Sequence, residues 1–171
     1  MSYSLYDASV VLARDALASL TSVLKKGEAH AAADSLPEAR LYPDMLPLAF
    51  QVYMMTDTAS KMCARLSGEE PAVLENNLKT FADFHARIAQ VEAIVAKADQ
   101  ATVNARAAEV VTIGLGPGKS APMACSAYVN GYALPNIFFH LTTAYGILRK
   151  EGVPLGKTDY LVAFVGKHVS R

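Results

Sequence analysis

The sequence predicts an all-α protein: a single domain over residues 1–171, built around four long helices, with a short β-like hairpin before the last of them. Three observations predict this class. Apolar residues recur at steps of three and four over long stretches, as one face of an amphipathic helix requires. Glycine and proline lie between those stretches, where they end helices. Hydrophobic residues make up 52% of the chain, which is enough to fill the core of such a domain.

The four helices are expected over about 5–26, 44–67, 78–98 and 126–151. Gly27 is expected to end the first helix. Asp44 is the expected N-cap of the second, with Pro47 tolerated in its first turn. In the fourth helix, Pro135 has no N–H to donate, so we expect a kink or break near residues 132–134.

Two further segments differ from this regular pattern. The third helix carries an apolar stripe that His85 and Glu92 interrupt, and we expect His85 to be a partly buried, hydrogen-bonded structural residue. Between the third and fourth helices, a β-like run leads into a glycine-rich turn, which predicts a hairpin over about 108–125. After Gly152 the chain is expected to be extended before a last short segment.

Composition excludes several classes of function. Lysine plus arginine number 16 and aspartate plus glutamate number 16, so the basic excess of a phosphate-binding protein is missing and we expect no nucleic-acid partner. No apolar run reaches the roughly 18–20 residues that cross a bilayer, and the first residues do not resemble a signal peptide. Cys63 and Cys125 are far apart in the sequence, which favours free thiols. We therefore expect a cytoplasmic protein without a membrane partner.

The fourth helix carries the most informative motif, a row of polar residues at a spacing of four. The row consists of Tyr128, Tyr132, Asn136 and His140. Its neighbours along the chain are mostly apolar, and polar groups in apolar surroundings destabilise a protein unless they are hydrogen-bonded. The row is therefore either a structural network between helices or the polar lining of a pocket, and the spacing alone favours neither.

The second helix carries an aspartate among methionines. If Asp57 points outward, it forms an ordinary surface pair with Lys61, four residues later. If it points inward, it needs a buried partner, and His140 is the best candidate. The methionines expected in this helix are Met45, Met54, Met55 and Met62. They either fill the core or form the adaptable wall of a ligand cavity.

Several segments resemble a known family. Residues 134–149 read LPNIFFHLTTAYGILR and are followed by GVPLGK at residues 152–157. Residues 43–48 (PDMLPL) and 80–84 (TFADF) match the same pattern. On these segments the chain resembles a domain-of-unknown-function branch of the DinB/YfiT-like superfamily over essentially its whole length. The resemblance implies an up-down-down-up four-helix bundle that is usually dimeric.

The resemblance also implies what a metal site would need. In the superfamily, three histidines often bind a divalent metal, one on the second helix and two spaced HxxxH on the fourth. Here the fourth helix offers Asn136 and His140, and the second offers Gln51 and Asp57. Because amides are weaker ligands for zinc or nickel than imidazole, we expect no bound metal and no other cofactor.

These observations predict a small-molecule pocket between the second and fourth helices. If the protein is an enzyme, we expect cofactor-independent acid–base isomerisation or cyclisation of an apolar metabolite. His140 would then transfer the proton, since its ordinary pKa lies near neutral pH, and Asp57 would orient it. The expected ligand contacts are Gln51, Met54, Met55, Met62, Tyr128, Tyr132 and Asn136. Two alternatives stay open: a metal-dependent thiol transferase or isomerase of the DinB type, and a non-catalytic binding or stress-associated protein.

Overall fold

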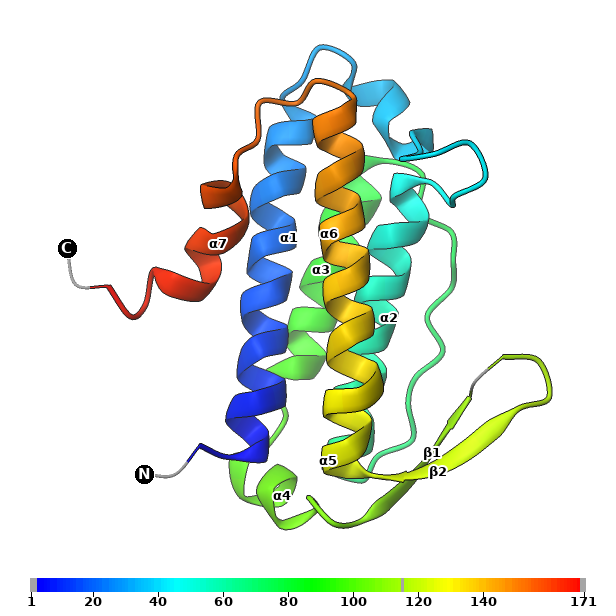
Figure 1. Cartoon of the computed structure of the whole chain (residues 1–171), viewed down its shortest axis with the longest axis vertical. Coiled ribbons are helices and arrows are strands. Elements are labelled where there is room, and N and C mark those ends of the chain that lie inside the picture. Colours follow the sequence, from blue (N-terminus) through cyan, green and yellow to red (C-terminus); the bar gives the residue numbers. More distant parts are fainter. Residues whose placement is uncertain (1–2, 115, 170–171) are drawn as a thin grey trace.

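The computed structural model describes residues 3–114 and 116–169 and is predominantly helical, with one small two-stranded sheet (Figure 1). Its four long helices are α1 (Leu12–Glu28), α2 (Leu48–Ser67), α3 (Phe81–Val95) and α6 (Leu134–Lys150). Helix α6 packs against both α1 and α2, and α3 packs against the same two helices. The apolar core lies between these four helices.

The first helix forms in the expected place. A π-helical turn at Asp7–Val11 leads into α1, and a short helix, α7 (Lys157–Val165), packs against the outside of α1 (Figure 1). Gly27, however, lies inside α1 and does not end it. A Cβ at this position would lie 2.9 Å from Leu148 Cδ2, so the glycine permits close packing of α1 against α6.

The start of α2 differs from the prediction. The helix begins at Leu48, and Pro47 is its N-cap with extended backbone angles (φ −71°, ψ 174°). Proline disfavours helical angles at the residue before it, so the helix cannot extend back to Asp44. Met45 therefore lies before α2, and its assignment to this helix was wrong. At the other end, Gly68 adopts φ +78° and ends α2.

Helix α3 is shorter than expected and is rotated relative to the expected stripe. It begins at Phe81 because Thr80 and Asp83 form a capping box. Its core face is formed by Phe81, Phe84, Ile88, Val91 and Val95. Glu92 is exposed. His85 is partly exposed, with Nε2 3.1 Å from Glu28 Oε2.

The segment between α3 and α6 contains the expected hairpin and one helix that was not expected. The unexpected helix is α4 (Gln100–Ala105). Strands β1 (Val110–Gly114) and β2 (Ser120–Ala124) pair antiparallel, within the predicted range, and extend away from the helices (Figure 1). Leu115, in the predicted turn, lies outside the described residues.

The fourth expected helix is interrupted where the proline predicted it. It comprises α5 (Cys125–Tyr128), a π-helical turn at Val129–Ala133, and α6. Pro135 lies in the first turn of α6 and cannot donate to the carbonyl of residue 131. The π-helical turn accommodates this missing hydrogen bond.

No helix in residues 3–114 and 116–169 is long and apolar enough to cross a membrane.

Candidate functional site

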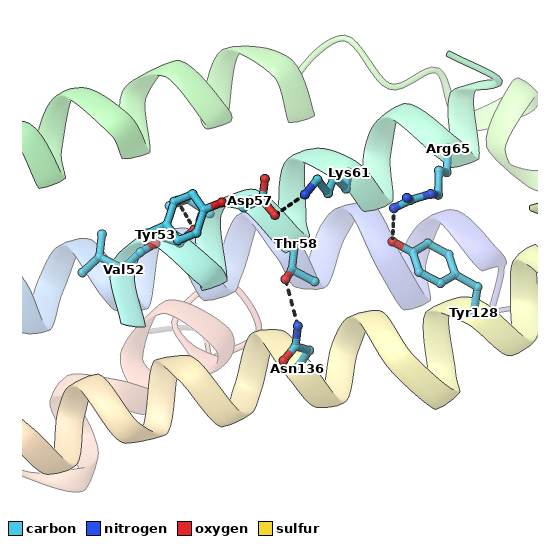
Figure 2. A network of polar contacts seen from close by, with 9 residues as sticks. Val52, Tyr53, Asp57, Thr58, Lys61, Arg65, Tyr128 and Asn136 are labelled. Carbon is cyan, nitrogen blue, oxygen red and sulfur yellow. Dashed lines mark hydrogen bonds and ion pairs between the residues drawn. The ribbon is translucent and has the colours of Figure 1, made fainter. Parts of the chain in front are cut away.

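Polar side chains connect α2 to the helical segment 125–150 at three levels. The pairs are Gln51 with His140 (2.7 Å), Thr58 with Asn136 (3.0 Å), and Arg65 with Tyr128 (3.1 Å). Figure 2 shows the second and third pairs. The three α2 members are spaced by seven residues, a spacing that returns a helical side chain to nearly the same face. Three members of the polar row in residues 128–140 thus form a network between helices.

The Gln51–His140 pair is closed and buried. Gln51 Nε2 donates to the carbonyl oxygen of Leu46 at 2.9 Å, so its Oε1 is the atom that faces the histidine. His140 Nδ1–H therefore donates to Gln51 Oε1. Burial lowers the pKa of His140 from 6.5 to about 4, because the charged ring would lose its hydration. The ring is neutral near pH 7.

Of the two partners that the sequence offered for Asp57, the structure shows Lys61 and not His140. Asp57 Oδ2 accepts a hydrogen bond from Lys61 Nζ at 2.6 Å, although the aspartate is only 4% exposed. Because Thr58 faces Asn136 on α6, its neighbour Asp57 is rotated about 100° away from that contact. Its second oxygen, Oδ1, is buried without a hydrogen-bond partner among the described residues.

A pocket of about 230 Å³ lies beside Asp57, between α2, the end of β1 and the segment of α5 with the π-helical turn. Its lining residues are Met54, Asp57, Thr58, Lys61, Arg65, Ile113, Gly114, Tyr128 and Tyr132. Four of the expected site residues are among them: Met54, Asp57, Tyr128 and Tyr132. The structure therefore brings these four residues together around one pocket.

The other expected site residues lie outside this lining: Gln51, Met55, Met62, Asn136 and His140. Met55 and Met62 are fully buried in the core and do not line this pocket. Gln51, Asn136 and His140 belong instead to the contacts between α2 and α6.

Two cations in the pocket were not predicted as site residues. Asp57, Lys61 and Arg65 follow one another at a spacing of four along α2 and therefore share one face (Figure 2). Arg65 Nη1 donates to Tyr128 Oη, and its Cζ lies 5.4 Å from the centre of that ring. Tyr128 in turn stacks on Tyr132, with centroids 6.0 Å apart. Burial raises the pKa of Tyr128, so the phenol stays protonated.

The side chains at the superfamily's metal-binding positions do not fit a transition metal. Among residues 3–114 and 116–169, no three histidine, cysteine, aspartate or glutamate side chains come together. His140 Nδ1 is bound to Gln51, and the Asn136 amide nitrogen donates to Thr58. Two amides and one imidazole form a weak donor set for zinc or nickel.

Comparison with known proteins shows a DinB-like helical protein. Residues 5–161 match the family model described as "Domain of unknown function (DUF1993)", and the chain belongs to that family. No curated protein matches the chain. The chain is similar to the crystal structure of a DinB family member protein from Shewanella denitrificans, with 36% sequence identity and a TM-score of 0.81. The match covers 92% of this chain and 91% of the other, and it agrees with the resemblance found in the sequence.

Proposed function

We propose that this protein is a helical bundle that binds a small molecule in the 230 Å³ pocket beside α2. The observation that carries the proposal is the mixed lining of this pocket. Met54 and Ile113 offer apolar surface, while Asp57 and Arg65 carry opposite charges. Small-molecule sites are concave and apolar, with a few polar groups that fix the ligand's orientation. The volume suits a ligand of about one ring.

The proposal includes the up-down-down-up topology. In Figure 1, where colour follows the sequence, the chain runs upward through α1 and α6 and downward through α2 and α3. The long connection between α2 and α3 returns along the length of the molecule, which supports two successive helices with the same direction. In this arrangement the pocket lies near one end of α2, next to the hairpin.

Binding is favoured over the expected acid–base chemistry. The isomerase hypothesis required His140 and Asp57 to act together on one ligand, but their side chains have different partners. His140 also lies outside the pocket lining. The alternative of a metal-dependent thiol transferase or isomerase requires imidazole ligands, and two of the three positions hold the amides of Gln51 and Asn136.

A pocket-filling substitution tests the proposal. Met54→Trp places a large ring in the lining, whereas Phe50→Trp places the same ring one turn earlier on α2, outside it. We expect small aromatic acids, amides and alcohols to give saturation-transfer NMR signals with the wild type and with Phe50→Trp. Met54→Trp should abolish these signals while circular dichroism shows an intact helical fold. Equal signals from Met54→Trp would place the binding elsewhere and contradict the proposal.

We also propose that the protein is a homodimer, as its family resemblance implies. Three large apolar side chains support this proposal by their exposure: Leu41 (39%), Leu46 (47%) and Phe139 (58%). Leu41 and Phe139 line the same open groove. Light scattering at micromolar concentration should give about twice the 18.3 kDa chain mass, and only the monomer mass would contradict it. The expected cytoplasmic location stays a prediction.

A further inference from the structure

We infer that the ligand of the 230 Å³ pocket is a small organic anion, whose carboxylate or phosphate lies against Arg65 and Lys61. Its apolar body would then contact Met54, Ile113 and Tyr132. This inference rests on the proposed function, because it specifies the chemical class of the ligand in the same pocket.

The pocket lining has a surplus of positive charge. Three of its lining residues are charged, and the two cations outnumber the one anion. Asp57 is bound to Lys61, so this pair is close to neutral. Arg65 forms no ion pair with any carboxylate in the described part of the chain, and its hydrogen-bond partner there is the phenol of Tyr128 (Figure 2). One positive charge is left over.

The Arg65 side chain is held in place and has unused hydrogen-bond donors. A guanidinium has five N–H donors, and one is used by Tyr128. Arg65 is also partly buried, so it has lost part of its hydration without gaining a carboxylate. Tyr128 is fully buried and holds the guanidinium in place. An arginine that is fixed in advance loses less freedom when it binds an anion in its planar fork.

The pocket on the other side of Arg65 carries more negative charge. Arg65 also borders a second pocket of about 340 Å³, together with Arg106, Glu69 and Glu70. In that pocket Arg106 is already paired with Glu109 at 2.7 Å, and the two glutamates add negative charge. An anion is therefore favoured on the Lys61 side of Arg65 and repelled on the other side.

The pocket lining also has apolar surface for the rest of the ligand. The apolar part of the pocket lining is formed by Met54, Ile113 and the ring of Tyr132, which stacks on Tyr128. Thioether, aliphatic and aromatic surfaces together favour a flat apolar group. The anion is therefore expected to carry a ring or a short hydrocarbon chain.

The test compares charged and neutral probes of nearly the same shape. Phenylacetate and phenyl phosphate carry the two anionic groups, and phenylacetamide is the neutral match of phenylacetate. In isothermal titration calorimetry with wild-type protein, we expect at least one anion to bind about tenfold more tightly than the amide, since hydrogen bonds to charged groups are stronger than neutral ones. The better anion identifies the carboxylate or the phosphate as the preferred group.

Substitutions then identify the cation. Arg65→Met should weaken binding of the preferred anion about 10- to 100-fold and leave the amide nearly unchanged. Arg65→Lys should recover part of the loss, because it restores the charge without the planar fork. Arg106→Met is the matched control from the neighbouring pocket and should change binding by less than about twofold.

Each failure has its own meaning. If phenylacetamide binds wild-type protein as tightly as both anions, the inference is overturned while the proposed binding function stands. If Arg106→Met abolishes anion binding and Arg65→Met does not, the anion lies in the other pocket and the inference is again wrong. If no probe binds wild-type protein, both proposals fall. The wild-type comparison remains decisive even if Arg65→Met does not fold.

Discussion

The two ends of the contact between α2 and the segment 125–150 each hold a polar pair but differ in how the polar atoms are hydrogen-bonded. At one end, His140 and Gln51 bind each other and are buried, and the rings of Phe50 and Phe139 contact the histidine. At the other end, Arg65 and Tyr128 are hydrogen-bonded, but the arginine keeps free donors beside a pocket. At the first end the buried side chains bond each other, whereas at the second the guanidinium still has N–H donors without a partner among the described residues.

A row of polar residues on one helix therefore need not have a single role. Its spacing predicts that the side chains share a face, and it does not predict which of them find partners. In this protein the neutral, mutually bonded pair serves packing, whereas the end with surplus positive charge is the better candidate for binding. Substitutions and changes of pH at each end can test this division.

Acid should destabilise the protein through His140. Its pKa is about 4 in the folded chain and near 6.5 when the ring is in water, so the unfolded chain binds the additional proton between these values. Stability should therefore fall as pH decreases from 6.5 to 4, by an amount on the order of 3 kcal/mol. Urea denaturation at pH 7, 5.5 and 4 measures this slope, and His140→Phe should flatten it. An unchanged slope in His140→Phe would show that the ring is not buried as described.

At pH 7, His140→Phe should itself lower the free energy of unfolding by about 1–3 kcal/mol, because Gln51 Oε1 loses its donor inside the core. The pocket probes should still bind. His85→Phe is the matched control on a partly exposed histidine and should cost less than about 0.5 kcal/mol. Retained stability with lost binding in His140→Phe would instead assign the histidine to the ligand.

Asp57→Asn should change stability by less than about 1 kcal/mol, because Lys61 is partly exposed and the substitution also removes a buried charge. It should tighten binding of phenylacetate by about two- to tenfold, since one negative charge leaves the pocket. Asp15→Asn, which breaks a 2.6 Å pair with Lys167 outside this pocket, should leave binding unchanged. Weaker anion binding in Asp57→Asn would contradict the anionic ligand.

The purified protein should carry no tightly bound transition metal. Asn136 stands where the superfamily's helix-four pair needs a histidine, and the remaining imidazole of His140 is engaged with Gln51. Elemental analysis after extensive dialysis measures this directly. About one zinc, nickel or iron per chain that is lost in His140→Ala would contradict the prediction.

Much of the fold could be predicted because long apolar periodicities and proline positions act locally. The interruption before Pro135 follows from a missing N–H donor, and the hairpin follows from its glycine-rich turn. Helix α4 was missed because its six residues are too few to show a periodic pattern. The start of α2 lies later than predicted because Pro47 disfavours helical angles at the residue before it.

The site was predicted only in part because its geometry depends on helix rotation. Asp57 and Thr58 are neighbours in the sequence, yet only Thr58 faces α6, and no periodicity in a short polar motif resolves that choice. Arg65 was missed because a cation in the last turn of a helix is ordinary, where it interacts favourably with the helix dipole. Its spacing of four from Lys61 was the available signal.

The π-helical turn at Val129–Ala133 determines which residues of the segment 125–150 face α2. Thr58 and Arg65 are seven residues apart, whereas their partners Asn136 and Tyr128 are eight apart. In an uninterrupted α-helix the eighth residue would overshoot the shared face by about 80°, and the wider turn absorbs that one residue. Regular α-helix over the same residues, with none removed, would turn the Tyr128 phenol about 80° away from Arg65, whereas removing one residue as well would keep it on the shared face. At this sequence length the π-helical turn is therefore what keeps the Tyr128 phenol beside the Arg65 guanidinium and the pocket.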